Sequence, residues 1–200
     1  MKILIACETS GVVREAFRLR GHEVYSCDLL PSQDDSPFHL ECDVRAMLRE
    51  RAWDLMIAHP PCTYLCNSGV RWFTTIPKHP DPDVVYGEDR WRAMAEGAQL
   101  FKDLWNAPIP KIVIENPVMH KYAREAIGGM KFSQTIQPWE FGHGEVKRTC
   151  LWIKGLRFLY PTDIVDGRHP ACFLAAPRDR WQIRSNTYPG IAKAMAEQWG

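Results

Sequence analysis

The stretch MKILIACETSGVVREAFRLRGHEVYSCD, residues 1–28, decides the fold class. Lys2 to Ala6 is a short run of apolar, mostly β-branched residues, which predicts a buried strand. Val12 to Arg20 carries apolar residues at helical spacing and predicts a helix. Val24 to Cys27 predicts a second strand, closed by Asp28. The stretch therefore predicts a strand, a turn, a helix and a second strand that ends in an acidic residue.

The same alternation continues further along the chain. Asp54 to Ala58 and Lys111 to Glu115 predict buried strands, and Asp89 to Asn106 between them predicts an amphipathic helix. Thr149 to Ile153 predicts a late strand, and Asn186 to Trp199 ends in a helical pattern. Strands that alternate with helices are typical of an α/β fold with a mainly parallel sheet and helices on both faces.

Length and composition set the broad class. The chain has 200 residues, of which 46% are hydrophobic and 24% are charged, and this balance is typical of a folded soluble domain. We expect one domain over residues 1–200, with a loop-rich segment at about 154–184. No apolar run reaches the roughly 20 residues of a membrane span, so we expect no membrane partner.

The number of cysteines and the net charge indicate the redox compartment and the kind of partner. The seven cysteines are odd in number and scattered, which argues against a disulfide framework and predicts a reducing cytoplasm. No second cysteine pair has zinc spacing, so we expect no metal site. The net charge is +1, whereas proteins that grip long duplex DNA usually carry a basic excess.

Reactive or polar residues follow each of the predicted strands. They are Cys7 with Glu8, Asp28, His59 to Cys62, and Glu115 to Pro117. In open parallel sheets, ligands bind outside the carboxyl ends of the strands, where these segments meet. The sequence therefore predicts a functional site at this edge of the sheet.

Cys62 follows two prolines, which lack N–H groups and force the chain out of the sheet ladder. A thiol becomes a useful nucleophile when its pKa is lowered, and we expect a helix that starts just beyond Cys62 to contribute to that lowering. The alternative is a structural cysteine in a strand-to-loop turn.

Glu115 ends the next strand and is followed by Asn116 and Pro117. Its carboxyl group, in a protonated or shared-proton form, can hold a ring nitrogen and an exocyclic amine of a base. With Cys62 on a neighbouring strand, this pattern indicates covalent activation of a pyrimidine. The alternative for Glu115 alone is a carboxylate that caps the following helix near His120.

In these motifs the chain resembles the cytosine carbon-5 DNA methyltransferase family, and most of all its small phage-type members. The family's strand followed by Pro-Cys matches Ile57 to Cys62, and its Glu-Asn motif matches Glu115 to Pro117. Its Gln-x-Arg motif resembles Glu145 to Ile153, although Glu replaces Gln and the basic position is either Lys147 or Arg148. Its late Asn-containing helix resembles Ser185 to Ala192.

The resemblance implies a Rossmann-like, S-adenosylmethionine-dependent methyltransferase that methylates carbon 5 of cytosine through a cysteine adduct at carbon 6. It implies a host-cytoplasm location if the chain is phage-encoded. The catalytic residues that it implies are Cys62, Glu115, Lys147 and Arg148. The residues that it implies for the cofactor are Cys7, Glu8, Ser10, Gly11, Asp28, Asp43, Pro60 and Asn186.

Two departures from the family pattern affect these expectations. The first turn has a single glycine, Gly11, where the family usually has Phe-x-Gly-x-Gly. The family's sequence-reading domain would fall between Lys154 and Arg184, an interval too short to hold one. The expected substrates are therefore DNA, single-stranded or with little sequence choice, or a cytosine nucleotide, and a protein partner could supply target recognition.

Two other functions remain open on the sequence. The first is a thymidylate-synthase-like enzyme, because such enzymes also place a cysteine against carbon 6 of a nucleotide and use folate. The second is a catalytically idle relative that only binds DNA.

Overall fold

The computed structural model describes residues 1–50, 52–170 and 186–200. Its main sheet has seven strands in the order β3-β2-β1-β4-β5-β8-β6. Strands β1 to β5 run parallel to their neighbours, and β8 runs antiparallel to both β5 and β6. The strands are β1 (Lys2–Ala6), β2 (Glu23–Asp28), β3 (His39–Glu41), β4 (Leu55–Ala58), β5 (Lys111–Pro117), β6 (Gln134–Ile136) and β8 (Thr149–Lys154). The strand order is that of a Rossmann-like fold with one reversed strand inserted, so the predicted fold class is confirmed.

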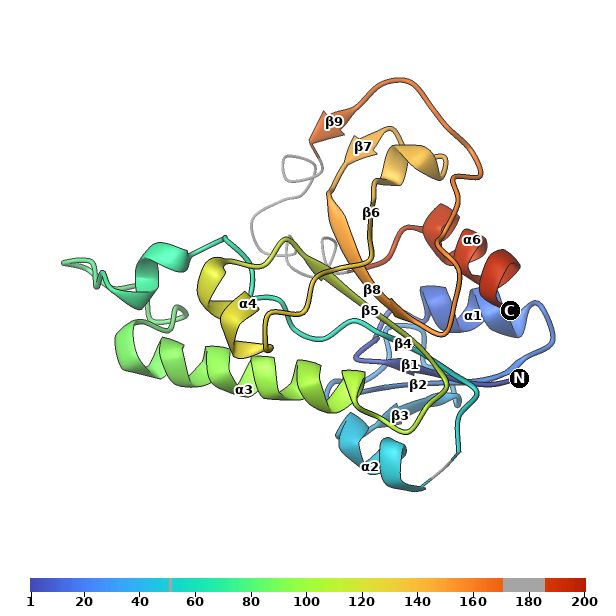
Figure 1. Ribbon diagram of the computed structural model, residues 1–200, viewed down its shortest axis with the longest axis horizontal. Helices are drawn as coiled ribbons and strands as arrows, with labels where there is room; N and C mark the ends of the chain where they lie inside the picture. Colours follow the sequence, from blue (N-terminus) through green and yellow to red (C-terminus); the bar gives the residue numbers. More distant parts are fainter. Residues whose placement is uncertain (51, 171–185) are drawn as a thin grey trace.

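Helices cover both faces of the sheet (Figure 1). They are α1 (Val12–Arg18), α2 (Val44–Glu50), α3 (Gly87–Trp105), α4 (Lys121–Ala126) and α6 (Pro189–Trp199), with short 3₁₀ turns η1 (Val70–Phe73) and η2 (Pro138–Glu140). Helices α1 and α6 lie on one face, and α2, α3 and α4 lie on the other (Figure 1). The predicted arrangement of helices on both faces is therefore confirmed.

Strand β1 shows why the sheet needs cover on both sides. Ile3 and Ile5 belong to the core under α1 and α6, together with Phe17. Leu4 and Ala6 alternate with them and belong to the core under α2 and α3. All four are fully buried, so the continuous apolar run reflects a strand buried on both faces.

Several boundaries differ from those predicted. The first helix ends at Arg18 instead of Arg20, because a tight turn closes it and Gly21 then adopts φ 82°. The third helix begins at Gly87 and ends at Trp105. Strand β5 continues to Pro117, because β8 pairs with it there, Asn116 opposite Cys150. The end of β5 is therefore set by a pairing partner that the local sequence does not contain.

The segment predicted to be loop-rich, at about residues 154–184, lies partly inside and partly outside the described part of the chain. Residues 155–168 form neither helix nor strand, and β9 (His169–Pro170) pairs with the short strand β7 (Glu145–Val146). Residues 171–185 lie outside the described part of the chain. Among the described residues, no helix combines the length and the apolar character that crossing a membrane requires.

The strand order reverses at β1 and β4, which lie side by side and lead to β2 and β5 on either side. The backbone N–H of His59 continues the β1–β4 ladder by donating to the Ala6 carbonyl oxygen at 2.9 Å. Crevices for ligands form where the order reverses, beyond the carboxyl ends of the strands. The fold therefore brings the predicted strand-end segments to one edge.

Candidate active site

Cys62 lies just past β4, in a single turn of chain instead of at a helix start. The backbone N–H groups of Leu65 and Cys66 both donate to the Cys62 carbonyl oxygen at 3.0 Å. The turn brings the two thiols within hydrogen-bonding reach of each other. His120 fixes the far side of the turn, because its backbone N–H donates to the Leu65 carbonyl oxygen at 3.0 Å.

The expected lowering of the Cys62 pKa is wrong. The hydrogen bond with Cys66 and burial raise the pKa of the Cys62 thiol far above its ordinary value. The nearby Cys66 and Glu115 raise it further, and only Lys147 acts in the opposite direction. The thiol of the free protein is therefore protonated, and any reaction at Cys62 requires a group that accepts its proton.

Glu115, at the end of β5, forms a buried pair with His59. The His59 Nδ1 atom lies 2.9 Å from Glu115 Oε2, and the two side chains are 9% and 14% exposed. Burial acts to raise the pKa of Glu115, but the hydrogen bond and charge of His59, with the charge of Lys147, outweigh it and lower the pKa. Glu115 of the free protein is therefore a carboxylate, and the protonated or shared-proton form expected with a base bound stays a prediction.

Asn116 and Pro60 connect the two strand ends. The Asn116 Nδ2 atom donates to the Pro60 carbonyl oxygen at 3.0 Å, while Asn116 Oδ1 is buried and has no hydrogen-bond partner within the described part of the chain. Pro60 thus takes part in the site through its backbone carbonyl group. It fixes the Pro-Pro-Cys segment against β5.

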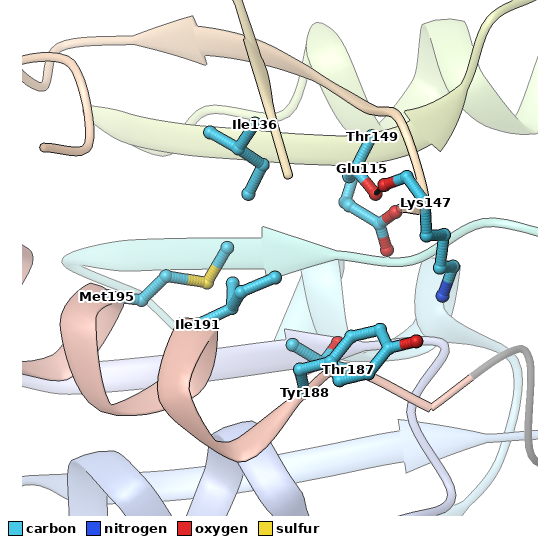
Figure 2. A pocket seen from close by; sticks show the side chains of 8 residues that line it. All are labelled: Glu115, Ile136, Lys147, Thr149, Thr187, Tyr188, Ile191 and Met195. Carbon is cyan, nitrogen blue, oxygen red and sulfur yellow. Dashed lines mark hydrogen bonds between the residues drawn. The ribbon is translucent and has the colours of Figure 1, made fainter. Parts of the chain in front are cut away.

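A small cavity opens beside Glu115. Its volume is about 10 Å³, roughly the room that one water molecule needs. The lining residues are Glu115, Ile136, Lys147, Thr149, Thr187, Tyr188, Ile191 and Met195. The Glu115 carboxylate and the Lys147 side chain lie toward one end, and the apolar side chains of Ile136, Ile191 and Met195 lie toward the other (Figure 2).

The structure separates the two basic candidates. Lys147 lines the cavity, and its Nζ lies 5.6 Å from the centre of the Tyr188 ring. Arg148 is exposed and is not among the lining residues. Lys147 also lowers the pKa of both Cys62 and Glu115, so its charge acts on both predicted catalytic groups.

Sequence reasoning gave no individual role to two residues at this edge, His59 and Tyr188. Burial raises the pKa of the Tyr188 hydroxyl, and so do a hydrogen bond with Glu145 and the charge of that group. Both missed residues lie inside motifs that the sequence had already singled out. The sequence signal that could have identified them is a titratable side chain close to a motif residue.

A second cluster forms at the ends of β1, β2 and β3. Cys7 adopts φ 58°, unusual for a residue with a side chain. Burial raises the pKa of Cys7, and so do the charges of Cys27, Asp28 and Asp43, which act on it from nearby. The structure therefore brings together three of the residues predicted for the cofactor.

The side chains of the first turn are engaged within the chain. Glu8 Oε1 accepts from the Val13 N–H at 2.7 Å, Oε2 accepts from the Arg14 N–H at 3.3 Å, and the Ser10 hydroxyl donates to Oε1 at 3.3 Å. Burial raises the pKa of Glu8, against the charge of His59 and the two N–H bonds. A Cβ on Gly11 would lie 2.3 Å from the Arg14 guanidinium, so the packing of the chain itself requires this glycine.

Asp28 and Asp43 each cap a turn. Asp28 Oδ1 accepts from the Leu30 N–H at 3.0 Å, and Asp43 Oδ1 accepts from the Arg45 N–H at 2.8 Å. The Asn186 amide donates to Gln33 Oε1 at 3.4 Å. Gln33 in turn donates to the Thr9 hydroxyl at 2.8 Å, so the late Asn segment is linked to the first turn through Gln33.

No group of three or more His, Cys, Asp or Glu side chains within the described ranges has the arrangement of a metal site. The prediction of no metal stays a prediction.

Comparisons with known proteins give similarity in structure alone. No protein-family model and no curated protein matches the chain. Among solved structures, one match is a protein described as a DNA modification methyltransferase encoded within a prophage (E. coli), with 13% identity and TM-score 0.47, covering 89% of this chain and 56% of that one. A DNMT2 variant from Spodoptera frugiperda has 16% identity and TM-score 0.43, covering 90% and 56%.

The Entamoeba histolytica methyltransferase EhMeth has 13% identity and TM-score 0.45, covering 88% of this chain and 60% of that one. The chain thus spans little more than half the length of these matched proteins. At such identities and TM-scores, the matches do not establish a family for the chain.

Proposed function

We propose that the chain is an S-adenosylmethionine-dependent methyltransferase that acts on carbon 5 of cytosine through a covalent bond from Cys62 to carbon 6. One observation carries the proposal. The end of β4 supplies a thiol and the end of β5 supplies a carboxylate, and Lys147 acts electrostatically on both. Attack on a pyrimidine needs a nucleophile, an acceptor for the amine of the base, and a positive charge for the electrons that enter the ring.

Each of the three residues has a role in this reaction. The Cys62 sulfur bonds to carbon 6, and the electrons of the carbon 5–carbon 6 double bond move into the ring. Glu115 accepts a hydrogen bond from the 4-amino group, and the Lys147 ammonium group stabilises the negative charge on the ring. Carbon 5 becomes nucleophilic as a result and can accept the methyl group that the cofactor would supply. Loss of the carbon 5 proton to water then restores the carbon 5–carbon 6 double bond and releases the Cys62 sulfur as a thiolate.

For the cofactor, the residues that fit best are Asp28 and Asp43. When bound, S-adenosylmethionine supplies an electrophilic methyl group. Asp28 lies at a strand end where an acidic residue binds ribose hydroxyls in nucleotide folds, and the half-exposed Asp43 carboxylate can accept from an adenine amine. The Glu8 carboxylate and the Ser10 hydroxyl already bond within the chain, so we assign this turn a supporting role.

We propose a nucleic acid or nucleotide substrate with an unstacked cytosine. The net charge of +1 and the short interval from Lys154 to Arg184 both argue against tight, sequence-selective binding of duplex DNA. A single strand avoids the cost of flipping a base out of a duplex, about a few kcal/mol. We expect a single-stranded oligonucleotide to be methylated at least as well as the matching duplex.

The test compares two neighbouring cysteines. Purified protein is incubated with labelled S-adenosylmethionine and single-stranded, duplex or mononucleotide cytosine, and 5-methylcytosine is measured by mass spectrometry. Cys62→Ser should abolish methylation, with its fold retained, whereas Cys66→Ser should retain the reaction. Activity of Cys62→Ser within about tenfold of wild type, or ~1.4 kcal/mol of barrier, would contradict the nucleophile assignment.

One observation favours a second substrate. A carboxylate such as Glu115 accepts hydrogen bonds and therefore fits the N3–H of a uracil directly. The same assay with uracil-containing substrates, and with a folate donor in place of S-adenosylmethionine, separates the cytosine reaction from thymidylate-synthase-like chemistry. Trapping of Cys62 by a 5-fluorocytosine substrate excludes a catalytically idle protein.

A further inference from the structure

His59 occupies the point where the strand order reverses, between the ends of β1 and β4. Its backbone N–H donates to the Ala6 carbonyl oxygen at 2.9 Å, and its side chain is 9% exposed. On one side of the ring, Nδ1 lies 2.9 Å from Glu115 Oε2. The other ring nitrogen, Nε2, is buried and has no hydrogen-bond partner among the residues that the structure describes.

Two buried carboxylates flank this imidazole. Glu115 contacts it from β5, and Glu8, beyond the end of β1, feels its charge. Both Glu8 oxygens already accept N–H groups at the start of α1, so the hydrogen bond of His59 goes to Glu115. The third charged group at this edge, Lys147, also acts on Glu115.

This arrangement assigns a direction to the hydrogen bond. Because Glu115 is a carboxylate, it accepts, and the proton of the bond sits on His59 Nδ1. Oε2 is thereby occupied, and Oε1 remains for the cavity side of the carboxylate. A buried nitrogen without a partner costs about 1–3 kcal/mol. Native proteins seldom keep such an atom unless the group has another use.

We infer that His59 is a positioning residue that fixes the Glu115 carboxylate, through its Nδ1–H, as the relay that carries the Cys62 proton to N3 of the bound cytosine. The inference rests on the proposed function. It resolves the difficulty that Cys62 is protonated at rest, since Glu115 is the carboxylate that acts on it.

The relay balances without any further reactant. The S–H bond of Cys62 breaks and its proton passes to Glu115 Oε1, the carboxylate whose charge acts on this thiol. The sulfur electron pair forms the bond to carbon 6. The displaced ring electrons take the proton from Glu115 at N3, so Glu115 is a carboxylate again. His59 keeps its own proton throughout and never touches the base.

The experiment measures exchange of the carbon 5 hydrogen of cytosine with deuterated water, in single-stranded oligonucleotide and without a methyl donor. This exchange reports attack by Cys62 alone. His59→Phe keeps a ring but removes the donor, and His59→Asn keeps an N–H donor near the Nδ1 position. We expect His59→Phe to slow exchange about 10²-fold with oligonucleotide affinity unchanged, and His59→Asn to retain most of the rate.

The pH profile distinguishes a relay from mere packing. Exchange falls at low pH as Glu115 becomes protonated, and His59 lowers the pKa of Glu115. Removing His59 should therefore move this acid limb to higher pH in His59→Phe, and part of the way in His59→Asn, whose amide donates but carries no charge.

The outcomes separate the two proposals. If wild type exchanges hydrogen but the acid limb of His59→Phe coincides with that of wild type, the inference about His59 is overturned and the proposed function stands. If His59→Phe does not fold, an unmoved acid limb in His59→Asn has the same meaning. If wild type catalyses no exchange on any pyrimidine substrate, both proposals fall.

Discussion

The two halves of the functional edge are built differently. At the ends of β1 to β3, which we call the cofactor edge, the side chains of Glu8, Asp28 and Asp43 all accept backbone N–H groups of the turns that follow. At the ends of β4 and β5 and the start of β8, which we call the base edge, buried polar atoms of His59 and Asn116 have no partner among the described residues. Folding alone accounts for the first set and not for the second.

The contrast is sharpest in two buried glutamates. Burial raises the pKa of Glu8, whose bonds to N–H groups do not compensate for it. His59 and Lys147 outweigh burial at Glu115 and lower its pKa. A glutamate that caps a helix and a glutamate that sits between two basic groups thus respond to pH in opposite directions. The comparison teaches that the balance between burial and the neighbouring donors and charges, and not burial alone, decides the direction in which the pKa of a buried carboxylate moves.

Among tests of this comparison, we expect Glu115→Gln to have the largest effect. We expect activity to fall about 10²–10⁴-fold, since a base and hydrogen-bond acceptor is lost. Unfolding free energy should fall by about 1.5–3 kcal/mol at neutral pH, because His59 and Lys147 lose a charged partner. Because the folded-state pKa is below the ordinary 4.5, this stabilisation is present above 4.5 and is lost as pH falls through the folded value.

Denaturant unfolding across pH measures the effect on stability. The matched control is Glu125→Gln, at an exposed carboxylate paired only with Lys121, where we expect a change within about 0.5 kcal/mol. A Glu115→Gln protein as stable as wild type at pH 7 would mean that the base edge is no more specialised than the cofactor edge.

Asp28→Ala tests whether the cofactor edge has a function beyond its own turns. S-adenosylmethionine at 100 times its Kd should stabilise wild type by about 2.7 kcal/mol. A tenfold weaker affinity in Asp28→Ala would remove about 1.4 kcal/mol of that. Asp54→Ala is the control, because Asp54 also accepts a backbone N–H, from Lys2 at 2.7 Å, but follows no strand end of the site.

Thermal unfolding with and without cofactor reads out both variants. If the cofactor raises the melting temperature of Asp28→Ala as much as that of wild type, Asp28 is not part of the proposed site. If the cofactor does not raise the melting temperature of wild type, the cofactor assignment is wrong.

Glu8→Gln should give the smallest effect, with the opposite pH dependence. Because the folded-state pKa of Glu8 is raised, wild type gains stability from this group as pH falls toward 4.5 and loses it as pH rises through the folded value. A glutamine oxygen still accepts the Val13 N–H, so the variant should match or exceed wild type at pH 8 by up to about 1 kcal/mol. The same unfolding series measures it, and a stability loss that grows with pH would contradict the assignment.

Sequence alone predicted the fold well where burial sets it. The apolar run of β1 is buried on both faces, and its alternation with α1 and β2 suffices to predict a parallel sheet. The approach of Cys62 to Glu115 also followed, because the carboxyl ends of parallel strands share one edge. Neither conclusion depends on the direction of any side chain.

Side-chain direction explains what sequence could not predict. The pairing of His59 with Glu115 joins residues 56 positions apart and depends on how two strand-end side chains turn, which no periodicity records. The pKa of Cys62 was predicted in the wrong direction, because the next turn presents Cys66 to the sulfur instead of a helix start. The choice of Lys147 over Arg148 required the pairing of β8 with β5.

The inserted strand β8 also bears on the order in which the two edges form during folding. Strand β6 precedes β8 in the chain, and among the described residues it pairs only with β8. Strand β5 also pairs with β8, on the side away from β4. Contacts distant in sequence form slowly, and β4 pairs with β5 across 56 positions and β5 with β8 across 32 to 42, whereas β1 pairs with β2 across 21. Lys147 and Thr149, which line the cavity, are carried into place with β8. During refolding, the pairing of β1 with β2 at the cofactor edge should therefore form early, and reactivity at Cys62 should return only when β4, β5 and β8 have all paired.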